Sequence, residues 1–149
     1  MKYTRQATVE DMHYLSTRLR KADVREVEAL GYLPLESLLQ GLRDSSKCLV
    51  MAPGGKPVGV YGICPTASPA VGLIWMLATP ELEAHQMKFL RHSKKAVSDL
   101  MGDYELVYNY TDVRNTLHHS WLKWCGAVAL SKHPLGISGE EFIEFVIRK

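Results

Sequence analysis

The sequence predicts an α+β fold, in which helices cover both faces of a mixed, mostly antiparallel sheet. Two observations carry this prediction. Alternating or continuous apolar runs, typical of strands, interleave with helical periodicity in the order β-α-α-β-β-β-α-β-α-β-β. Near the C-terminus, a strand is followed by a helix that Asn115 opens and Gly126 closes, and then by another strand. The chain has 149 residues, a length that suits a single domain over 1–149.

The N-terminal part predicts one short strand and two helical segments. Residues 2–7 alternate enough for a strand, and Thr8 then caps a helix in which Asp11 takes the third helical position. Apolar residues recur at helical spacing beyond this cap, with a predicted break near 22–23. A second, shorter helix is expected over 35–42 for the same reason.

The middle of the chain predicts three strands and a long helix. Strands are expected at 47–51 and 58–63, joined by a hairpin turn over Pro53–Pro57. The continuous apolar run 70–78 predicts a fully buried strand. A helix opened by a Thr-Pro pair is then expected over 79–101, with its apolar residues on one side.

The C-terminal part predicts a strand at 106–113, the helix from Asn115 to Gly126, and two strands at 128–131 and 142–147. An Asn side chain at a helix start can accept a backbone N–H of the first turn. A Gly after the last turn can adopt the left-handed conformation that ends a helix. The eleven-residue spacing corresponds to about 16 Å of helix, enough to cross the face of a sheet.

This helix and the order of elements resemble the acyl-CoA-dependent N-acyltransferases of the GNAT fold. The resemblance implies acetyl-CoA as the cofactor and transfer of its acetyl group to an amine. Within that superfamily, the chain is similar to a group of tailed-phage proteins that includes internal virion protein A of short-tailed phages. The blocks that carry this likeness are 20–31, 104–110, 115–116 and 122–128. It implies a phage-encoded protein of the host bacterial cytoplasm, acting on a host or phage amine or associated with the virion.

Composition limits the other classes of function. The net charge of +2 is too small to indicate nucleic acid or an acidic membrane as the main partner. Three widely spaced cysteines, Cys48, Cys64 and Cys125, give no disulfide framework, so a reducing compartment is the simplest expectation. The N-terminus lacks the apolar segment of a signal peptide, and no stretch approaches the ~20 apolar residues of a membrane span.

The GNAT resemblance places the cofactor between the end of the 70–78 strand and the helix that follows. In the family, a glycine-rich loop there presents backbone N–H groups to the CoA pyrophosphate. This chain has no glycine between Gly72 and Gly102, and it carries Glu81 and Glu83 at the helix start. The cofactor contacts expected from the resemblance are Leu77, Ala78, Thr79, Ala84, Lys88 and, on the pantetheine side, Asn115.

Acyl transfer also needs a base for the amine and an acid for the leaving thiolate. The family's usual acid is a Tyr seven residues after the Asn, a position that Leu122 takes here. Tyr108 and Tyr110, on the preceding strand, are candidate replacements, and Tyr110 is the one we select. One candidate base is a histidine of the helix, His118 or His119, of which at most one can face a cleft, and we select His118. The other is Asp112, near the strand end where the family's sheet splays open. No ligand spacing typical of a metal site is present, so no metal is expected.

Three functions stay open on these grounds. The first is an N-acyltransferase that uses acetyl-CoA. The second is a catalytically degenerate GNAT fold, kept as a binding module in virion assembly, since a fold does not determine a chemistry. The third is a binder of nucleic acid or of a host protein. It would use a basic helix face that offers no aromatic platform for base stacking, formed by Lys88, Arg91, His92 and Lys95.

Overall fold

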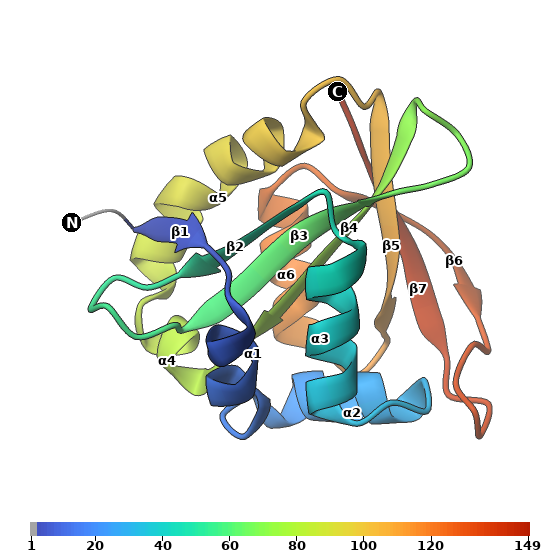
Figure 1. Cartoon of the computed structure of the whole chain (residues 1–149). Helices are drawn as coiled ribbons and strands as arrows, with labels where there is room; N and C mark the ends of the chain where they lie inside the picture. Colours follow the sequence, from blue (N-terminus) through green and yellow to red (C-terminus); the bar gives the residue numbers. More distant parts are fainter. Residues whose placement is uncertain (1–2) are drawn as a thin grey trace.

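Seven strands form one sheet in the computed structural model, which describes residues 3–149 (Figure 1). Their order across the sheet is β1-β2-β3-β4-β5-β7-β6, with β4 and β5 parallel and the other neighbours antiparallel. The strands are β1 (Thr4–Gln6), β2 (Lys47–Met51), β3 (Gly59–Pro65), β4 (Val71–Ala78), β5 (Leu106–Asp112), β6 (Val128–His133) and β7 (Phe142–Arg148). The predicted mixed, mostly antiparallel sheet is confirmed. Lys2, where the first strand was expected to begin, lies outside the described residues.

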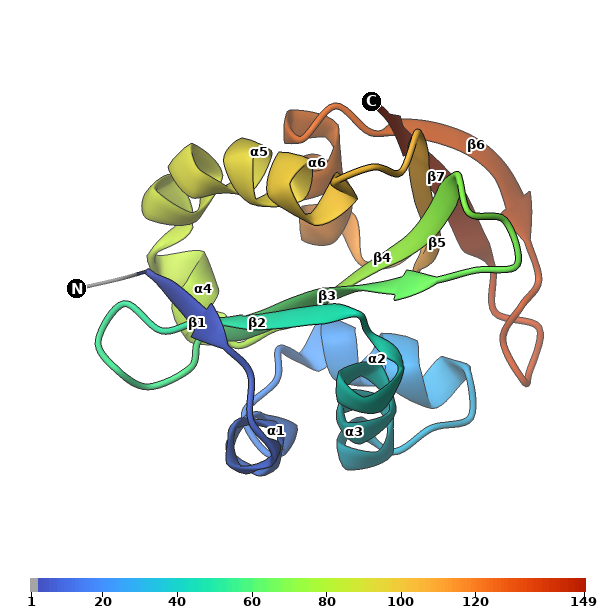
Figure 2. The ribbon, with the colours of Figure 1, turned by 45° about the horizontal axis from the view of Figure 1, so that its top comes forward.

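Three helices cover each face of the sheet (Figure 2). One face carries α1 (Val9–Ser16), α2 (Lys21–Ala29) and α3 (Pro34–Asp44), and the opposite face carries α4 (Pro80–Ala84), α5 (Gln86–Met101) and α6 (Thr116–Trp124). Apolar side chains fill both layers, with Met12 and Leu38 fully buried in the first and Phe89 and Trp121 buried in the second. Within residues 3–149, no helix is long and apolar enough to cross a membrane.

The first helical segment begins as predicted but breaks earlier. The Thr8 hydroxyl accepts from the N–H of Asp11, and the Asp11 carboxylate accepts from the N–H of Thr8, so the predicted cap is confirmed. The break lies between α1 and α2 rather than near 22–23, because the backbone N–H of Arg20 donates to the carbonyl of Ala78 at the end of β4 (2.8 Å). A contact with the sheet thus sets the start of α2.

The helix predicted over 79–101 is divided in two. His85, with φ −108° and ψ 23°, ends α4, and α5 begins at the next residue. Leu82 from α4 and Phe89 and Leu100 from α5 are nonetheless buried in the same apolar core, as the periodicity predicts.

The parallel pairing of β4 with β5 is short, and this opens a gap in the sheet. Only Val71 to Leu73 of β4 pair with β5 within the described residues. At the next position the side-chain amide of Asn109 donates to the carbonyl of Ile74 (2.7 Å) in place of a backbone pair. Trp75 is partly exposed as a result, so the prediction that the 70–78 strand is fully buried is wrong.

Helix α2 supplies hydrogen bonds that the separated strands cannot give each other. The carboxylate of Asp23 accepts from the backbone N–H of Ala78 in β4 (2.8 Å), and the carboxylate of Glu26 accepts from the N–H of Asp112 in β5 (2.6 Å). Buried backbone groups must find partners. Side chains of α2 therefore replace part of the missing ladder between β4 and β5.

Removing the carboxylate of Asp23 should destabilise the fold strongly. Asp23→Ala leaves the N–H of Ala78 without its partner and breaks a buried ion pair with Arg20 (2.9 Å). We expect the free energy of unfolding in urea to fall by about 3 kcal/mol. The control is Asp44→Ala, which removes an exposed carboxylate paired with exposed Arg43 and should cost less than about 1 kcal/mol. Equal losses for the two variants would contradict the role given to α2.

Candidate active site

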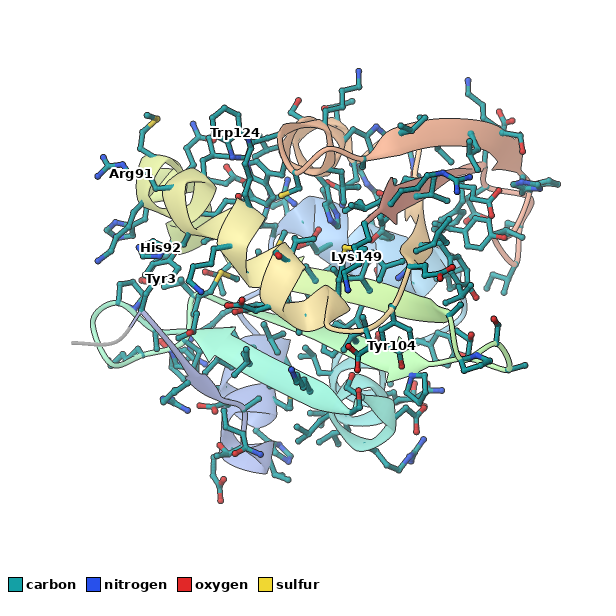
Figure 3. The ribbon with its side chains drawn as sticks, turned by 90° about the horizontal axis from the view of Figure 1, so that it is seen from above. Tyr3, Arg91, His92, Tyr104, Trp124 and Lys149 are labelled. Carbon is teal, nitrogen blue, oxygen red and sulfur yellow. The ribbon has the colours of Figure 1, made fainter. Side chains whose placement is uncertain are left out.

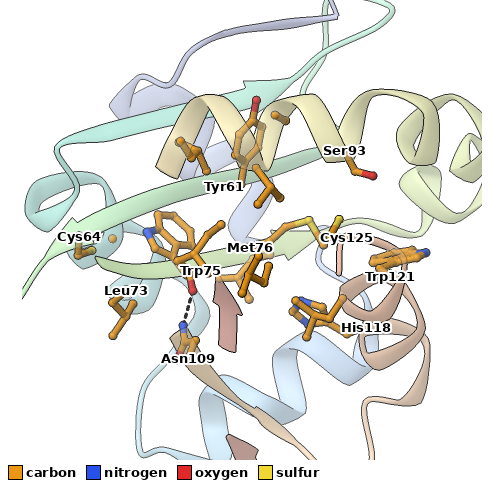
Figure 4. A pocket seen from close by; sticks show the side chains of 18 of the residues that line it. Tyr61, Cys64, Leu73, Trp75, Met76, Ser93, Asn109, His118, Trp121 and Cys125 are labelled. Carbon is orange, nitrogen blue, oxygen red and sulfur yellow. Dashed lines mark hydrogen bonds between the residues drawn. The ribbon is translucent and has the colours of Figure 1, made fainter. Parts of the chain in front are cut away.

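A cavity of about 350 Å³ lies between the sheet and helices α5 and α6 (Figure 4). It continues through the gap between β4 and β5, because its walls include Phe89 and Trp121 on one side of the sheet and Val27 and Gly41 on the other. The lining is mainly apolar. The cavity therefore reaches both faces of the sheet through this gap.

Helix α6 brings two unpartnered polar nitrogens to this cavity. His118 Nδ1 and Trp121 Nε1 are buried and have no hydrogen-bond partner among the described residues, and both side chains line the cavity. Buried polar atoms in proteins are nearly always hydrogen-bonded, so orphaned ones need an explanation such as a ligand or a water molecule. Here they mark the α6 side as a surface able to bind polar groups of a ligand.

Two titratable groups with oppositely shifted pKa values lie together beside the gap. Burial raises the pKa of Glu26 to about 7, although the carboxylate accepts hydrogen bonds from Asp112 N–H and the Thr111 hydroxyl. Burial lowers the pKa of His118 to about 4. Both line the cavity. A carboxylate that titrates near neutral pH in a ligand-sized space is a strong candidate for a general base.

Glu26 and His118 also belong to a three-residue cluster with Asp23. Potential ligand atoms of the three residues lie within 4.8 Å of one another. Asp23, however, already binds the guanidinium of Arg20 (2.9 Å), the side-chain amide of Asn115 (2.9 Å) and a backbone N–H. A guanidinium thus provides the positive charge that this carboxylate requires, and the arrangement suits proton transfer better than ion binding.

Arg20 bridges the wide end of the gap. Its guanidinium binds Glu83 of α4 (2.6 Å), Asp23 of α2 and the side-chain oxygen of Asn115 (3.3 Å), which precedes α6. It also lies 5.1 Å from the ring centre of Trp121. Arg20 is 6% exposed, whereas the side chain of Glu83 is 44% exposed. One buried cation therefore joins the elements on both sides of the opening.

The structure gives the predicted cofactor residues different environments. Leu77 and Ala78 end β4, Thr79 follows them, and all three are buried. The N–H of Ala78 already donates to Asp23 of α2, and its carbonyl accepts from the N–H of Arg20, just before that helix. Asn115 precedes α6 as predicted, but its side chain forms no cap hydrogen bond, because it is turned toward Arg20 and Asp23.

Further along, Ala84 and Lys88 are exposed. Lys88 lies over the ring of Tyr3, which also stacks on His92 (centroids 4.6 Å apart), beneath α5 (Figure 3). Lys95 is paired with Asp99. The basic face of α5 is thus partly engaged in contacts within the molecule.

The predicted catalytic residues are not all brought together. His118 and Tyr110 line the cavity, as does Leu122, which takes the place of the family's Tyr. Asp112 does not line it: its carboxylate faces Arg114 (2.6 Å), and hydrogen bonds from Arg114 outweigh burial and hold its pKa below the usual range. The backbone N–H of Asp112 instead positions Glu26. Sequence reasoning missed Glu26, whose one signal is its spacing of three from Asp23 on the buried side of a polar helix.

No family model matches the chain, and no curated protein matches its sequence. Solved structures match its fold. A GNAT acetyltransferase from Bacillus anthracis has a TM-score of 0.70 at 9% identity, over 99% of this chain and 95% of that one. AAC(6')-Ib in complex with ribostamycin and coenzyme A has a TM-score of 0.72 at 14% identity (98% and 92%). A chimera of the spermidine N-acetyltransferase SpeG from Vibrio cholerae and hSSAT has a TM-score of 0.69 at 12% identity (97% and 93%). The chain therefore has the fold of the GNAT acetyltransferases.

The protonation of His118 can be measured directly. Because burial favours the neutral imidazole, its ring should titrate at about pH 4 in an NMR titration of the histidine side chains, well below the ordinary value of 6.5. His118→Gln identifies the signal by removing it. A midpoint near 6.5 would mean that the ring is solvated and that its Nδ1 is not held dry in the cavity.

Proposed function

We propose that the chain is an acetyl-CoA-dependent N-acetyltransferase that acts on an amine. The observation that carries this proposal is the cavity through the gap between β4 and β5, with Glu26, at a pKa of about 7, in its wall. The structurally similar AAC(6')-Ib was solved with coenzyme A, and another similar protein is named a spermidine N-acetyltransferase. These relatives support the same class of donor and acceptor for this fold.

The cavity fits the pantetheine arm of the donor. That arm is a chain of methylene groups with two amides, so it needs apolar walls and a small number of polar partners. Trp121 Nε1 can donate to an amide carbonyl, and His118 Nδ1, on the same helix, is a second free polar atom. Bound acetyl-CoA would supply an activated acyl group in this space.

Arg20 is the residue best placed for the phosphates. α4 has no glycine-rich loop, and two glutamates lie in its first turn. Arg20 is bonded to one of them, Glu83 (2.6 Å). A phosphate oxygen has the charge and hydrogen-bonding capacity of a carboxylate and could take the place of Glu83. The more exposed Lys88 is the other proposed contact, since the backbone N–H of buried Thr79 already donates to the carbonyl of Val58 (2.9 Å).

Glu26 acts as the base in this proposal. Its ionised carboxylate takes a proton from the acceptor nitrogen, while Asp112, through its backbone N–H, and Thr111 hold Oε1 in place. His118 stays neutral and accepts or donates a hydrogen bond at Nδ1. Tyr110 lines the same cavity, and its hydroxyl donates to Glu144 (3.4 Å). In this proposal it would leave that partner and return a proton to the leaving sulfur in place of the tyrosine that Leu122 replaces.

The resemblance to tailed-phage proteins adds a proposal about where the protein acts. The acceptor amine would belong to a host or phage molecule in the bacterial cytoplasm. A second candidate is a non-catalytic binding module that serves in virion assembly, and the contact of Arg20 with Glu83 across the opening is the observation in its favour. Binding of acetyl-CoA and turnover with an amine separate the two candidates.

The role of Glu26 predicts a specific pH dependence. Because a base acts when ionised, the acetylation rate should rise as pH increases through about 7 and level off above it. Glu26→Gln should lower kcat by about 100-fold or more and abolish this rise, while the Kd for acetyl-CoA in isothermal titration stays nearly constant. A variant with full turnover and an unchanged pH profile would exclude Glu26 as the base.

Because Glu83 competes with phosphate for Arg20, we expect the wild-type chain to bind CoA more weakly than a variant that lacks this carboxylate. Glu83→Gln frees Arg20 and should tighten CoA binding about three- to fivefold, measured by isothermal titration at low salt. Glu81→Gln is the matched control, since it removes the same charge from the same helical turn without an ion pair to Arg20. Pantetheine, which has no phosphate, should bind both variants alike. Equal tightening of CoA by both variants would contradict the assignment of Arg20.

A further inference from the structure

The cavity has a second end on the face covered by α2 and α3. There Leu73 and Trp75 of β4 face Val27 of α2 and Leu30, which follows that helix. Leu73 and Trp75 are two residues apart on one strand, so they point to the same face of the sheet. Both are partly exposed. Helix α3 adds the small or polar residues Ser37, Gln40, Gly41 and Asp44. This end is therefore apolar along β4 and α2 and more polar along α3, and a ligand bound there would cover the exposed parts of Leu73 and Trp75.

The indole of Trp75 is fixed in position by a hydrogen bond and by close packing. Its indole N–H donates to the hydroxyl of Ser45 (2.8 Å). A Cβ atom added to Gly41 would lie 2.6 Å from the indole ring, and one added to Gly62 would lie 2.9 Å from its nitrogen. The indole therefore packs directly against Gly41 and Gly62, at positions where a larger residue would collide with it. This packing and the hydrogen bond to Ser45 fix the orientation of the indole.

The charges of the lining favour a cation. Across residues 3–149, no Lys or Arg lines the cavity, whereas the acidic residues Glu26 and Asp44 do, and of these Asp44 is paired with the exposed Arg43 (3.2 Å). Glu26 is buried at the gap and Asp44 is exposed at the end of α3. An ammonium group is attracted to such a space and to the faces of its aromatic residues.

We propose that the acceptor is a primary amine on an aromatic or alkyl body, and that Trp75 selects it. The amine enters between α2 and α3 and reaches Glu26, while its apolar body packs on Trp75, Leu30 and Leu73. This inference rests on the proposed acetyltransferase function. In the transfer, the N–C bond forms as the C–S bond breaks, the electron pair leaves with sulfur, and the proton lost by nitrogen passes to Glu26. Sulfur then takes up a proton and leaves as the thiol.

The test compares amines of two kinds at a fixed concentration of acetyl-CoA. 2-Phenylethylamine and hexylamine represent the proposed class, and spermidine and ribostamycin represent polar polycations. Thiol release gives kcat/KM, and mass spectrometry identifies the acetylated product. We expect the apolar amines to be preferred by about 10-fold or more, as burial of several methylene groups predicts. Preference for spermidine or ribostamycin would overturn the inference and leave the acetyltransferase proposal standing.

Two substitutions should change the size of the acceptor site in opposite directions. Gly41→Ala forces the indole of Trp75 toward the cavity and should raise KM for 2-phenylethylamine with little change in kcat. Trp75→Phe enlarges the space and should favour tryptamine over 2-phenylethylamine. Gly54→Ala is the control, because an added Cβ there meets nothing within 4 Å. Circular dichroism and thermal melting establish that each variant is folded. Unchanged selectivity in folded Trp75→Phe would overturn the role of Trp75.

Direct binding separates this inference from the proposed function. 2-Phenylethylamine can be titrated by saturation-transfer NMR without acetyl-CoA. Binding that Gly41→Ala weakens and Gly54→Ala leaves intact supports the acceptor site even in a protein that transfers no acetyl group. Absence of both binding and turnover with the apolar amines overturns it, whatever the affinity for acetyl-CoA.

Discussion

The rest of the structure depends on how soon β4 and β5 stop pairing. Parallel pairing ends at Leu73, and Asn109 spans the first position of the divergence with its side chain. A continuous parallel pair would bury both strands and leave no space between them. The early divergence creates the cavity, joins the two faces of the sheet, and leaves backbone groups that another element must satisfy. Helix α2 meets that requirement, and its carboxylates are placed at the centre of the molecule as a result.

The carboxylates that complete the backbone hydrogen bonding of the sheet are also the acidic groups beside the cavity. Asp23 and Glu26 are buried because the separated strands require acceptors for their N–H groups. Asp23 has a guanidinium partner at hydrogen-bonding distance, which keeps its negative charge compensated. Glu26 has backbone and hydroxyl donors but no such ion pair, so burial dominates and its pKa rises to about 7. Two carboxylates three residues apart thus have different partners, one a guanidinium and the other only neutral donors.

Local features of the fold could be predicted from the sequence, and long-range contacts could not. The strands, the cap at Thr8 and the helix from Asn115 follow from periodicity and from residues a few positions apart. The buried cluster joins α2 to residues more than 50 positions away, such as Ala78 and Asn115. No local pattern marks such a contact. For the same reason, sequence reasoning named His118 and Tyr110, on recognisable elements of the resemblance, but not Glu26.

The two ends of the gap differ in charge. At the wide end of the gap, Arg20 is the buried cation, and its one partly exposed partner is Glu83. Inside, Glu26 is the buried acid, and toward α3 Asp44 adds a second carboxylate. An anionic donor is therefore attracted to one end and a cationic acceptor to the other, and each is repelled from the wrong end. Between the two ends the lining is mainly apolar, and in this proposal Glu26 takes the proton of the acceptor nitrogen before it attacks the acyl group. If the proposed function holds, the gap between β4 and β5 brings the two reactants together and places Glu26 beside the nucleophile, which would account for the interruption of the sheet.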